Sequence, residues 1–253
     1  MCGLVGVALG PKRRRRSEIE AILDAFTELL LRNEDRGPDA SGIAVVDRDG
    51  SFALMKRPVP PSTLVRLPIY DWTLDLVSNR TAAILGHTRR PTRGSVMNPM
   101  NNQPIRRGAT IATHNGTILN ADSLADWLGH ERLCEVDSEV LATVAEDSPS
   151  LAELVRRLRW MEGYLAAALV RVDDPARVQL LRGNKPLAIH HCERWRATFW
   201  SSLAEDLEDV LGAAKDLEPM TGMTVRDGRP IRRYRLALGG TARREQDVRV
   251  RLN

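Results

Sequence analysis

The sequence is poor in aromatic residues, which make up 4% of its 253 positions. Its core must therefore be built mainly from Leu, Val, Ile and Ala. Cysteine is scarce as well: Cys2, Cys134 and Cys192 are too few for the disulfide framework of a small secreted domain. The sequence has no Cys-x-x-Cys pair, and its five histidines are not clustered at ligand spacing, so we expect no structural zinc site.

Long apolar runs are also missing. No segment approaches the ~20 apolar residues that a membrane-spanning helix needs. The apolar segment 1–10 is short and has no positively charged region before it, so it is not a signal peptide. We therefore expect a cytoplasmic protein without a membrane partner. The net charge of +4 reflects mainly the basic segments 12–16 and 226–251. Because no aromatic residues interleave with the arginines, these segments favour solvated surfaces over a nucleic-acid partner.

Hydrophobic periodicity and turn signals predict an α+β domain with two sheets rather than a doubly wound parallel sheet. We predict a helix that begins with a capping box of Ser17 and Glu20 and ends near Asn33. Further helices are expected near 71–79, 120–128, 137–146, 150–158 and 202–213. Strands are expected at 3–9, 41–47, 52–57, 82–87, 110–114, 164–172, 177–182, 186–191 and 196–201, with two more within 222–235.

Cys2 is the first candidate for chemistry. Removal of Met1 would leave its thiol beside a free α-amino group, whose ordinary pKa of about 7.7–8.0 suits a base near neutral pH. The residue would then carry its own base, as N-terminal threonine nucleophiles do. A cysteine at the second position can equally be incidental, so this feature alone defines no function.

Several later segments each allow a structural and a functional interpretation. Arg36-Gly37-Pro38-Asp39 is either a turn after a helix or a brace near the cysteine. The loop after the strand ending at His87 contains Arg and Thr side chains that could hold a carboxylate. Asn115-Gly116 is either a plain turn or the donor pair of an oxyanion hole. Asp137 either caps a helix or binds an ammonium group.

Taken in order, these segments resemble the class II glutamine amidotransferases, a branch of the N-terminal-nucleophile hydrolases. The resemblance covers about residues 2–235, and the motif spacing is most similar to the glutaminase domain of glucosamine-6-phosphate synthase. It rests on Cys2-Gly3, Arg36-Gly37-Pro38-Asp39, Gly86-His87-Thr88-Arg89 with Thr92 and Gly94, His114-Asn115-Gly116 with Asn120, and Asp137-Ser138-Glu139. The fold that it implies is a four-layer αββα sandwich.

The resemblance also implies a role for each candidate residue, with no metal or organic cofactor. Cys2 would be the nucleophile and its α-amine the base, and Asn115 and Gly116 would form the oxyanion hole. The substrate would be L-glutamine. Its binding residues would be Arg89 and Thr92 at the α-carboxylate, Asp137 at the α-ammonium group, and Arg36 as a support near Cys2.

Three features depart from the family pattern. Arg93 stands where the glucosamine synthase has His, and Arg90-Pro91 replace aromatic and small residues. Both changes bear on glutamine affinity more than on the chemistry. The basic run Lys12–Arg16 is the third departure.

We expect a class II glutamine amidotransferase domain at 2–237 and a charged tail at 238–253. Its implied function is hydrolysis of glutamine to glutamate and ammonia through a Cys2 thioester. Only about 18 residues follow position 235, too few for a synthase domain, so the expected partner is a separate ammonia-using synthetase chain. Two alternatives stay open: an amidohydrolase for another γ-glutamyl compound, and a non-catalytic regulatory domain.

Overall fold

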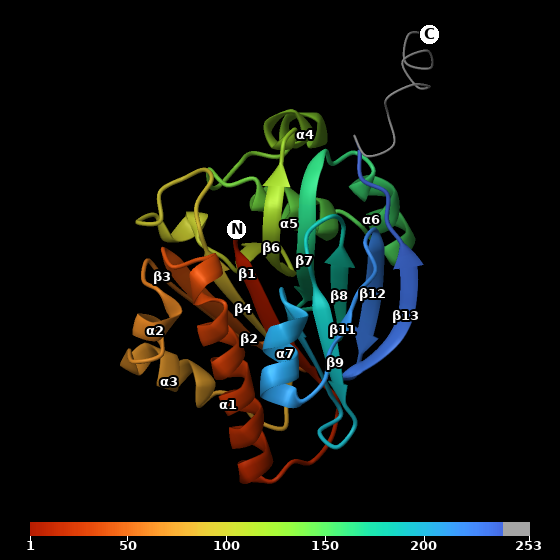
Figure 1. Ribbon diagram of the computed structural model, residues 1–253. Coiled ribbons are helices and arrows are strands. Elements are labelled where there is room, and N and C mark those ends of the chain that lie inside the picture. Colours follow the sequence, from red (N-terminus) through yellow and green to blue (C-terminus); the bar gives the residue numbers. More distant parts are fainter. Residues whose placement is uncertain (240–253) are drawn as a thin grey trace, which may run out of the picture.

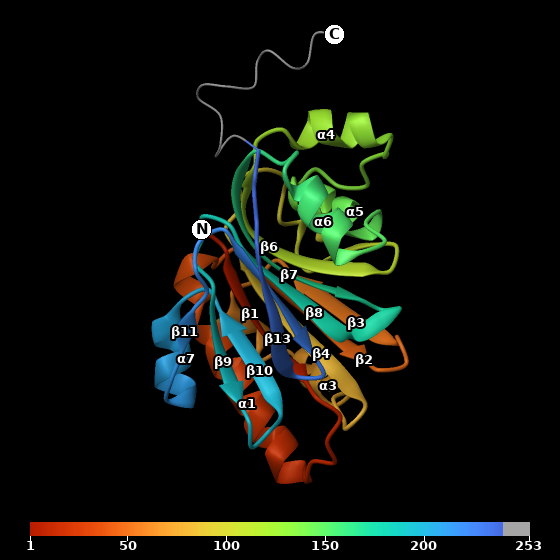
Figure 2. The same cartoon turned by 90° about the vertical axis from the view of Figure 1, so that its right-hand side faces the viewer.

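Two stacked antiparallel sheets form the centre of the molecule (Figures 1 and 2). The computed structural model describes residues 1–239, so all but the first two positions of the predicted charged tail 238–253 lie outside the described residues. One sheet has, in spatial order, β11 (Lys215–Asp216), β9 (Ala188–Cys192), β10 (Ala197–Ser201), β1 (Gly3–Leu9), β4 (Thr81–Arg89), β2 (Ala40–Asp47) and β3 (Phe52–Arg57). The other has β13 (Arg229–Arg235), β12 (Thr221–Arg226), β8 (Asp174–Arg182), β7 (Gly163–Arg171), β6 (Thr110–Ile118) and β5 (Ile105–Arg107).

Helices cover the outer face of each sheet (Figure 2). The sheet that contains β1 is covered by α1 (Arg16–Arg32), α2 (Pro61–Leu64), α3 (Pro68–Leu74) and α7 (Ala204–Leu211). The other sheet is covered by α4 (Ala121–Leu128), α5 (Ser138–Glu146) and α6 (Leu151–Leu158). Two short 3-10 helices, Glu34–Arg36 and Pro99–Asn101, lie in connecting segments. Among the described residues, no helix is long and apolar enough to cross a membrane.

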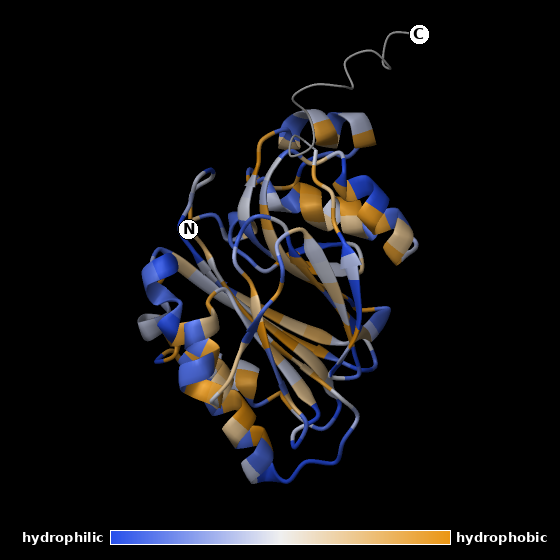
Figure 3. Ribbon diagram, turned by 45° about the vertical axis from the view of Figure 1, so that its right-hand side comes forward, coloured by the Kyte–Doolittle hydropathy of each residue, from blue (hydrophilic) through white to orange (hydrophobic). Residues whose placement is uncertain are grey.

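Three apolar cores separate these four layers. Alternate residues of a strand face opposite sides of its sheet, and β1 is buried on both. Val5 and Val7 join the core beneath α1, whereas Leu4 and Ala8 join the core between the sheets. A third core lies beneath α4, α5 and α6. Figure 3 shows the result, with apolar central strands and helices that are polar on one face. The predicted α+β class and αββα sandwich are confirmed.

The start of α1 differs from its predicted capping box. The helix begins at Arg16, and the carboxylate of Glu18 accepts the backbone N–H of Arg15 at 3.0 Å. Ser17 therefore lies inside the first turn, while Glu20 forms an exposed ion pair with Arg16. The predicted helix end at Asn33 is confirmed.

Other boundaries shift where tertiary contacts extend or replace a local pattern. The helix expected at 71–79 is instead α3 at 68–74, and the short helix α2, which had not been predicted, precedes it. The short strands β5 and β11 had not been predicted. Two strands run further than expected, β4 to Arg89 and β6 to Ile118. Both extensions bring predicted site residues into regular sheet structure.

Candidate active site

A cavity of about 260 Å³ opens beside the first residue of β1. This volume lies below the roughly 300–1,000 Å³ of pockets for drug-sized ligands, so it suits a small molecule such as an amino acid. Its walls combine residues from the chain start, the loop after β4, β6, the start of α5 and the loop after β8. The lining residues are Met1, Cys2, Arg89, Arg90, Thr92, Arg93, Gln103, His114, Asn115, Gly116, Thr117, Val136, Asp137, Ser138, Tyr164 and Lys185.

The backbone of Cys2 is held on both sides by side chains. Its nitrogen donates to Oδ1 of Asn115 at 3.2 Å, and its carbonyl accepts from Nε of Arg36 at 3.2 Å. The next nitrogen, that of Gly3, donates to the hydroxyl of Thr88 at 3.1 Å. The thiol itself lies 3.6 Å from the carbonyl oxygen of Arg90. Cys2 is thus fixed in the cavity by contacts from three separate segments.

Asn115 and Gly116 lie within β6, so the interpretation as a plain turn is wrong. Asn115 is 1% exposed, and its Nδ2 has no partner among the described residues. Gly116 has a φ of 154°, and a Cβ there would lie 1.9 Å from the carbonyl oxygen of Tyr164. Because a buried amide donor without a partner costs stability, the free Nδ2 of Asn115 points to a ligand acceptor.

Asp137 faces the cavity from the start of α5. It is the N-cap residue of α5, as the capping interpretation predicted, but its side chain makes no capping hydrogen bond to that helix. Its Oδ2 instead accepts the backbone N–H of Ile118 at 2.6 Å, across the gap to the end of β6. This bond fixes a carboxylate on the cavity wall, where it can accept hydrogen bonds from a cationic group.

Arg89 is 3% exposed, and its guanidinium is held from several sides. Nη1 donates to the Asn102 side chain at 2.7 Å, and Nη2 donates to the carbonyls of Arg93 and Gly94 at 2.7 and 2.9 Å. These bonds orient a buried cation at the cavity and also shape the loop that follows β4. Arg89 is therefore a rigidly held cation at the cavity wall.

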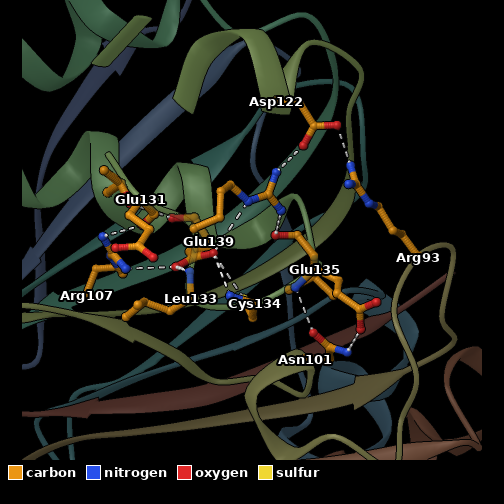
Figure 4. Close-up of polar contacts among 12 residues, drawn as sticks. Arg93, Asn101, Arg107, Asp122, Glu131, Leu133, Cys134, Glu135 and Glu139 are labelled. Carbon is orange, nitrogen blue, oxygen red and sulfur yellow. Dashed lines mark hydrogen bonds and ion pairs between the residues drawn. The ribbon is translucent and has the colours of Figure 1, made fainter. Parts of the chain in front are cut away.

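Arg93 and Thr92 belong to that same loop and are exposed at the cavity wall. The Arg93 guanidinium pairs with Asp122 of α4 at 2.7 Å, and the second Asp122 oxygen accepts from Arg132 (Figure 4). Arg132 also forms an ion pair with the buried carboxylate of Glu139, so the series of ion pairs continues to α5 (Figure 4). The loop after β4 is thereby tied to the segment that carries Asp137.

Arg36 is the one predicted site residue outside the cavity lining. It ends the short 3-10 helix after α1, and its Nε donates to the Cys2 carbonyl. Its contact therefore orients the Cys2 backbone, as the expected support near Cys2 would.

Two buried histidines stabilise the cavity floor. Nε2 of His87 donates to the carbonyl of His114, and Nε2 of His114 donates to the carbonyl of Tyr164. The second ring nitrogen of His114 is then free to accept the hydroxyl of Ser138 at 3.0 Å. Burial lowers the pKa of His87 to about 3 and lowers that of His114 as well. His87 is a packed histidine and is not among the residues that line the cavity.

Sequence reasoning missed two cavity residues that come from the second sheet. Lys185 follows β8, and Tyr164 is on β7. The Lys185 ammonium group lies 4.9 Å from the centre of the Tyr164 ring. The only signal in the sequence was a Gly-Asn turn after a predicted strand, which gives no direction for the side chains beside it.

The electrostatics of the chain start reflect its burial. Burial raises the pKa of the Cys2 thiol, while its contact with the Arg90 carbonyl acts in the opposite direction. Burial also lowers the pKa of the terminal amino group on Met1, as do the nearby cations Arg90, Arg36 and Lys185.

No protein-family model matches the chain, but its sequence is similar to those of several curated proteins. The glutamine–fructose-6-phosphate aminotransferase (isomerizing) of Aeropyrum pernix is 30% identical over 227 residues, covering 86% of this chain and 34% of the relative. The 7-cyano-7-deazaguanine synthase of Sulfolobus acidocaldarius is 30% identical over 249 residues, covering 93% of this chain and 50% of the relative. The chain thus spans about a third to a half of the length of these relatives.

Solved structures share the fold. The glutamine phosphoribosylpyrophosphate amidotransferase of B. subtilis superposes with a TM-score of 0.70 at 20% identity, covering 92% of this chain and 49% of that one. A glutamine aminotransferase class-II domain protein from Silicibacter pomeroyi gives 0.58 at 14% identity, covering 93% of this chain and 100% of that one. The fold is that of the N-terminal-nucleophile hydrolases. Within that class, the chain belongs to the class II glutamine amidotransferases, as its motifs predicted.

Proposed function

We propose that this chain hydrolyses L-glutamine to glutamate and ammonia, with Cys2 as the nucleophile after removal of Met1. One observation carries the proposal: the Cys2 nitrogen donates to Oδ1 of Asn115 beside the cavity, and Nδ2 of the same amide is buried with no partner among the described residues. In this proposal the α-amine of Cys2 is the base, its thiol is the nucleophile and Nδ2 of Asn115 is the oxyanion donor, so all three groups belong to two residues in direct contact. A γ-amide carbon bound there would meet all three groups required for acyl transfer.

In the proposed first step, the Cys2 α-amine takes the thiol proton and the sulfur attacks the side-chain amide carbon of glutamine. The oxygen of the tetrahedral intermediate accepts hydrogen bonds from Asn115 Nδ2 and from the Gly116 backbone. The α-amine then returns the proton to the leaving nitrogen, and ammonia departs. The C–N bond has been replaced by a C–S bond, a γ-glutamyl thioester.

In the second step, water attacks the thioester and the same amine accepts its proton. The oxyanion is again held by Asn115 and Gly116 until the C–S bond breaks. Glutamate leaves, and the proton returns to the thiolate. The atoms balance with glutamine and water as the only reactants, so the reaction draws on no metal or organic cofactor.

Charged groups at the other end of the cavity support glutamine as the substrate. The buried guanidinium of Arg89, with the hydroxyl of Thr92, suits the α-carboxylate. The carboxylate of Asp137 suits the α-ammonium group. A ligand that carries both charges on one carbon and an amide a short chain away would satisfy all of these groups.

We further propose that the ammonia passes to a separate synthetase chain, and that residues 2–237 form the amidotransferase domain. The relatives support an ammonia-using partner in general, because this chain corresponds to part of an aminotransferase and part of a synthase. Ammonia that escaped into water near neutral pH would be protonated and lose its nucleophilicity, which favours direct transfer.

The test is release of ammonia and glutamate from L-glutamine by protein whose free Cys2 N-terminus has been verified by mass spectrometry. The Cys2→Ala variant should release neither product. The Cys192→Ala variant is the matched control, since Cys192 lies on β9 away from the cavity, and it should retain activity.

A γ-glutamyl anilide should be assayed in parallel with glutamine. Faster turnover of the anilide would contradict glutamine as the preferred substrate and favour another γ-glutamyl compound. Product release that persists in Cys2→Ala would rule out the proposed nucleophile.

A further inference from the structure

A buried polar cluster lies beneath the start of β1, outside the cavity. It consists of Asn33, Thr88, Ser201 and Asp206, which are at most 6% exposed. These four residues come from the end of α1, β4, the end of β10 and α7. Burial of polar groups beside an apolar core costs stability unless they bind one another. The cluster is therefore held together by specific contacts.

The carboxylate of Asp206 is the acceptor at the base of this cluster. Its Oδ2 accepts from Nδ2 of Asn33 at 2.9 Å and from the hydroxyl of Ser201 at 3.0 Å. An ionised carboxylate offers only acceptors, which matches these two donors. Burial raises the pKa of Asp206, while the bonds from Ser201 and Asn33 act against that rise.

Hydrogen bonds lead from this carboxylate to the residue after Cys2. The main-chain oxygen of Asn33 accepts the Thr88 hydroxyl at 2.8 Å, and the same hydroxyl oxygen accepts the Gly3 N–H at 3.1 Å. A Cβ on Gly3 would lie 2.6 Å from Oδ1 of Asn33. The Gly3 backbone therefore rests directly on the Asn33 side chain that Asp206 orients.

A second connection is electrostatic and runs through Arg36. Its Nε donates to the Cys2 carbonyl, while its Nη2 is buried with no partner in the described part of the chain. Burial lowers the pKa of Arg36, and the negative charge of Asp206 acts in the opposite direction. Asp206 therefore balances the cation that lies against Cys2.

We propose that Asp206 is a positioning residue for Cys2, acting on the Cys2–Gly3 backbone through Asn33 and Arg36. The inference rests on the proposed function in taking Cys2 as the nucleophile. Asp206 is not among the residues that line the cavity. Other charged groups act on the same residues: Arg36, Arg89, Arg90, Asp137 and Lys185 around the chain start, and Arg32 and Glu205 around Asp206.

The test compares Asp206→Asn with Asp209→Asn, which changes an exposed carboxylate of the same helix that pairs with Arg32. The readout is the rate of Cys2 alkylation by iodoacetamide as a function of pH, followed by peptide mass spectrometry to separate Cys2 from Cys134 and Cys192. In Asp206→Asn the midpoint should move down by about half a pH unit, or about threefold in rate below the midpoint. The cause is that an unbalanced Arg36 cation favours the thiolate. Asp209→Asn should leave the midpoint unchanged.

Three results would overturn the proposal: an unchanged midpoint in Asp206→Asn, an equal shift in Asp209→Asn, or a shift that remains undiminished in an Arg36→Gln background. If Asp206→Asn does not fold, Ser201→Ala replaces it. Loss of the Ser201 donor makes the ionised form of the Asp206 carboxylate less stable. It should move the midpoint in the same direction by a smaller amount, and no movement would overturn the proposal. General loosening of the fold would slow or speed all three cysteines without moving one midpoint.

Alkylation uses no glutamine, so the two proposals fail separately. A Cys2 shift in a protein that hydrolyses no glutamine would remove the proposed function and retain the role of Asp206. Glutamine hydrolysis with no shift would do the reverse.

Discussion

The backbone nitrogen of Cys2 donates to Oδ1 of Asn115 at 3.2 Å, and Nδ2 of the same amide is buried with no partner among the described residues. This contact fixes which way the amide points, because only its oxygen can accept from the Cys2 nitrogen. The Nδ2 donor is then left for a ligand. One side chain thereby orients the proposed base and provides a donor for the proposed oxyanion.

Asn115→Ala should lower kcat for glutamine hydrolysis about 100- to 1,000-fold, because an oxyanion donor contributes roughly 2.7–4 kcal/mol to the barrier. KM should change little, since the oxyanion forms only during reaction. Steady-state kinetics measures both. Asn79→Ala is the control, because it removes a partnered amide far from the cavity, and its kcat should match that of the parent. A kcat within threefold of the parent in Asn115→Ala would contradict the oxyanion role.

A chain that keeps residues before Cys2 should be inactive. Met1 lines the cavity, and while it is attached the Cys2 nitrogen is an amide that cannot accept a proton. We expect no ammonia release from protein with a short Gly-Ser extension before Cys2, and full release once a protease exposes Cys2. Intact-mass measurement of each sample identifies its N-terminus. Equal activity before and after cleavage would exclude the α-amine as the base.

Arg89→Lys should raise KM for glutamine about 10- to 100-fold with a smaller effect on kcat. A lysine cannot reproduce the fork that binds a carboxylate while it donates to Asn102 and two carbonyls, and a hydrogen bond to a charged group contributes about 1.5–3 kcal/mol. Initial-rate kinetics over a range of glutamine concentrations measures the change. Arg57→Lys on the exposed edge strand β3 should leave KM unaltered. An unchanged KM in Arg89→Lys would place the carboxylate elsewhere.

The free energy of unfolding should fall as the pH drops below about 6.5. Burial lowers the pKa of His87 to about 3, so the unfolded chain, with an ordinary histidine pKa, takes up the proton first. The stability contributed by neutral His87 is complete above about pH 6.5 and is lost progressively toward pH 3. At pH 5 the loss is about 2 kcal/mol.

Urea titrations at pH 7 and pH 5 test this dependence. His87→Gln keeps a donor for the His114 carbonyl but does not titrate, so its stability should fall less between the two pH values. Any pH dependence of the unfolding free energy that remains in His87→Gln reflects other groups, including His114, whose pKa is also lowered by burial. If the unfolding free energy of His87→Gln falls as much between pH 7 and pH 5 as that of the parent, the acid sensitivity belongs to those other groups.

Local sequence signals predicted the elements that position the cavity. The run from Gly3 to Leu9 contains only apolar residues and glycine, which predicted a strand at 3–9, and β1 has those bounds. Motif order then allowed Cys2, Arg89, Asn115 and Asp137 to be grouped before any geometry was known. All four line one cavity, because the start of β1 lies beside the end of β4 and close to the later residues of β6.

Pairings between distant segments could not be predicted in this way. Asn115-Gly116 has the composition of a turn, yet both residues pair with Ala166 and Leu165 on β7. Asn33 was predicted to end a helix, and it is the C-cap of α1. Its side-chain amide also donates to Asp206, 173 positions away. Neither contact leaves a trace in the local pattern, because each depends on which strand or helix the fold places alongside.

The position of β1 in the middle of its sheet also sets when the molecule can act during its own synthesis. Val5 pairs with Ser201, which the ribosome adds 196 positions later. At about 5–20 residues per second this interval is about 10–40 s, and throughout it the first strand lacks one of its two neighbours. The Cys2 cavity therefore forms only when most of the chain has been translated. A nascent chain therefore carries Cys2 from the start and acquires most of the residues around it only later, from Arg89 to Lys185.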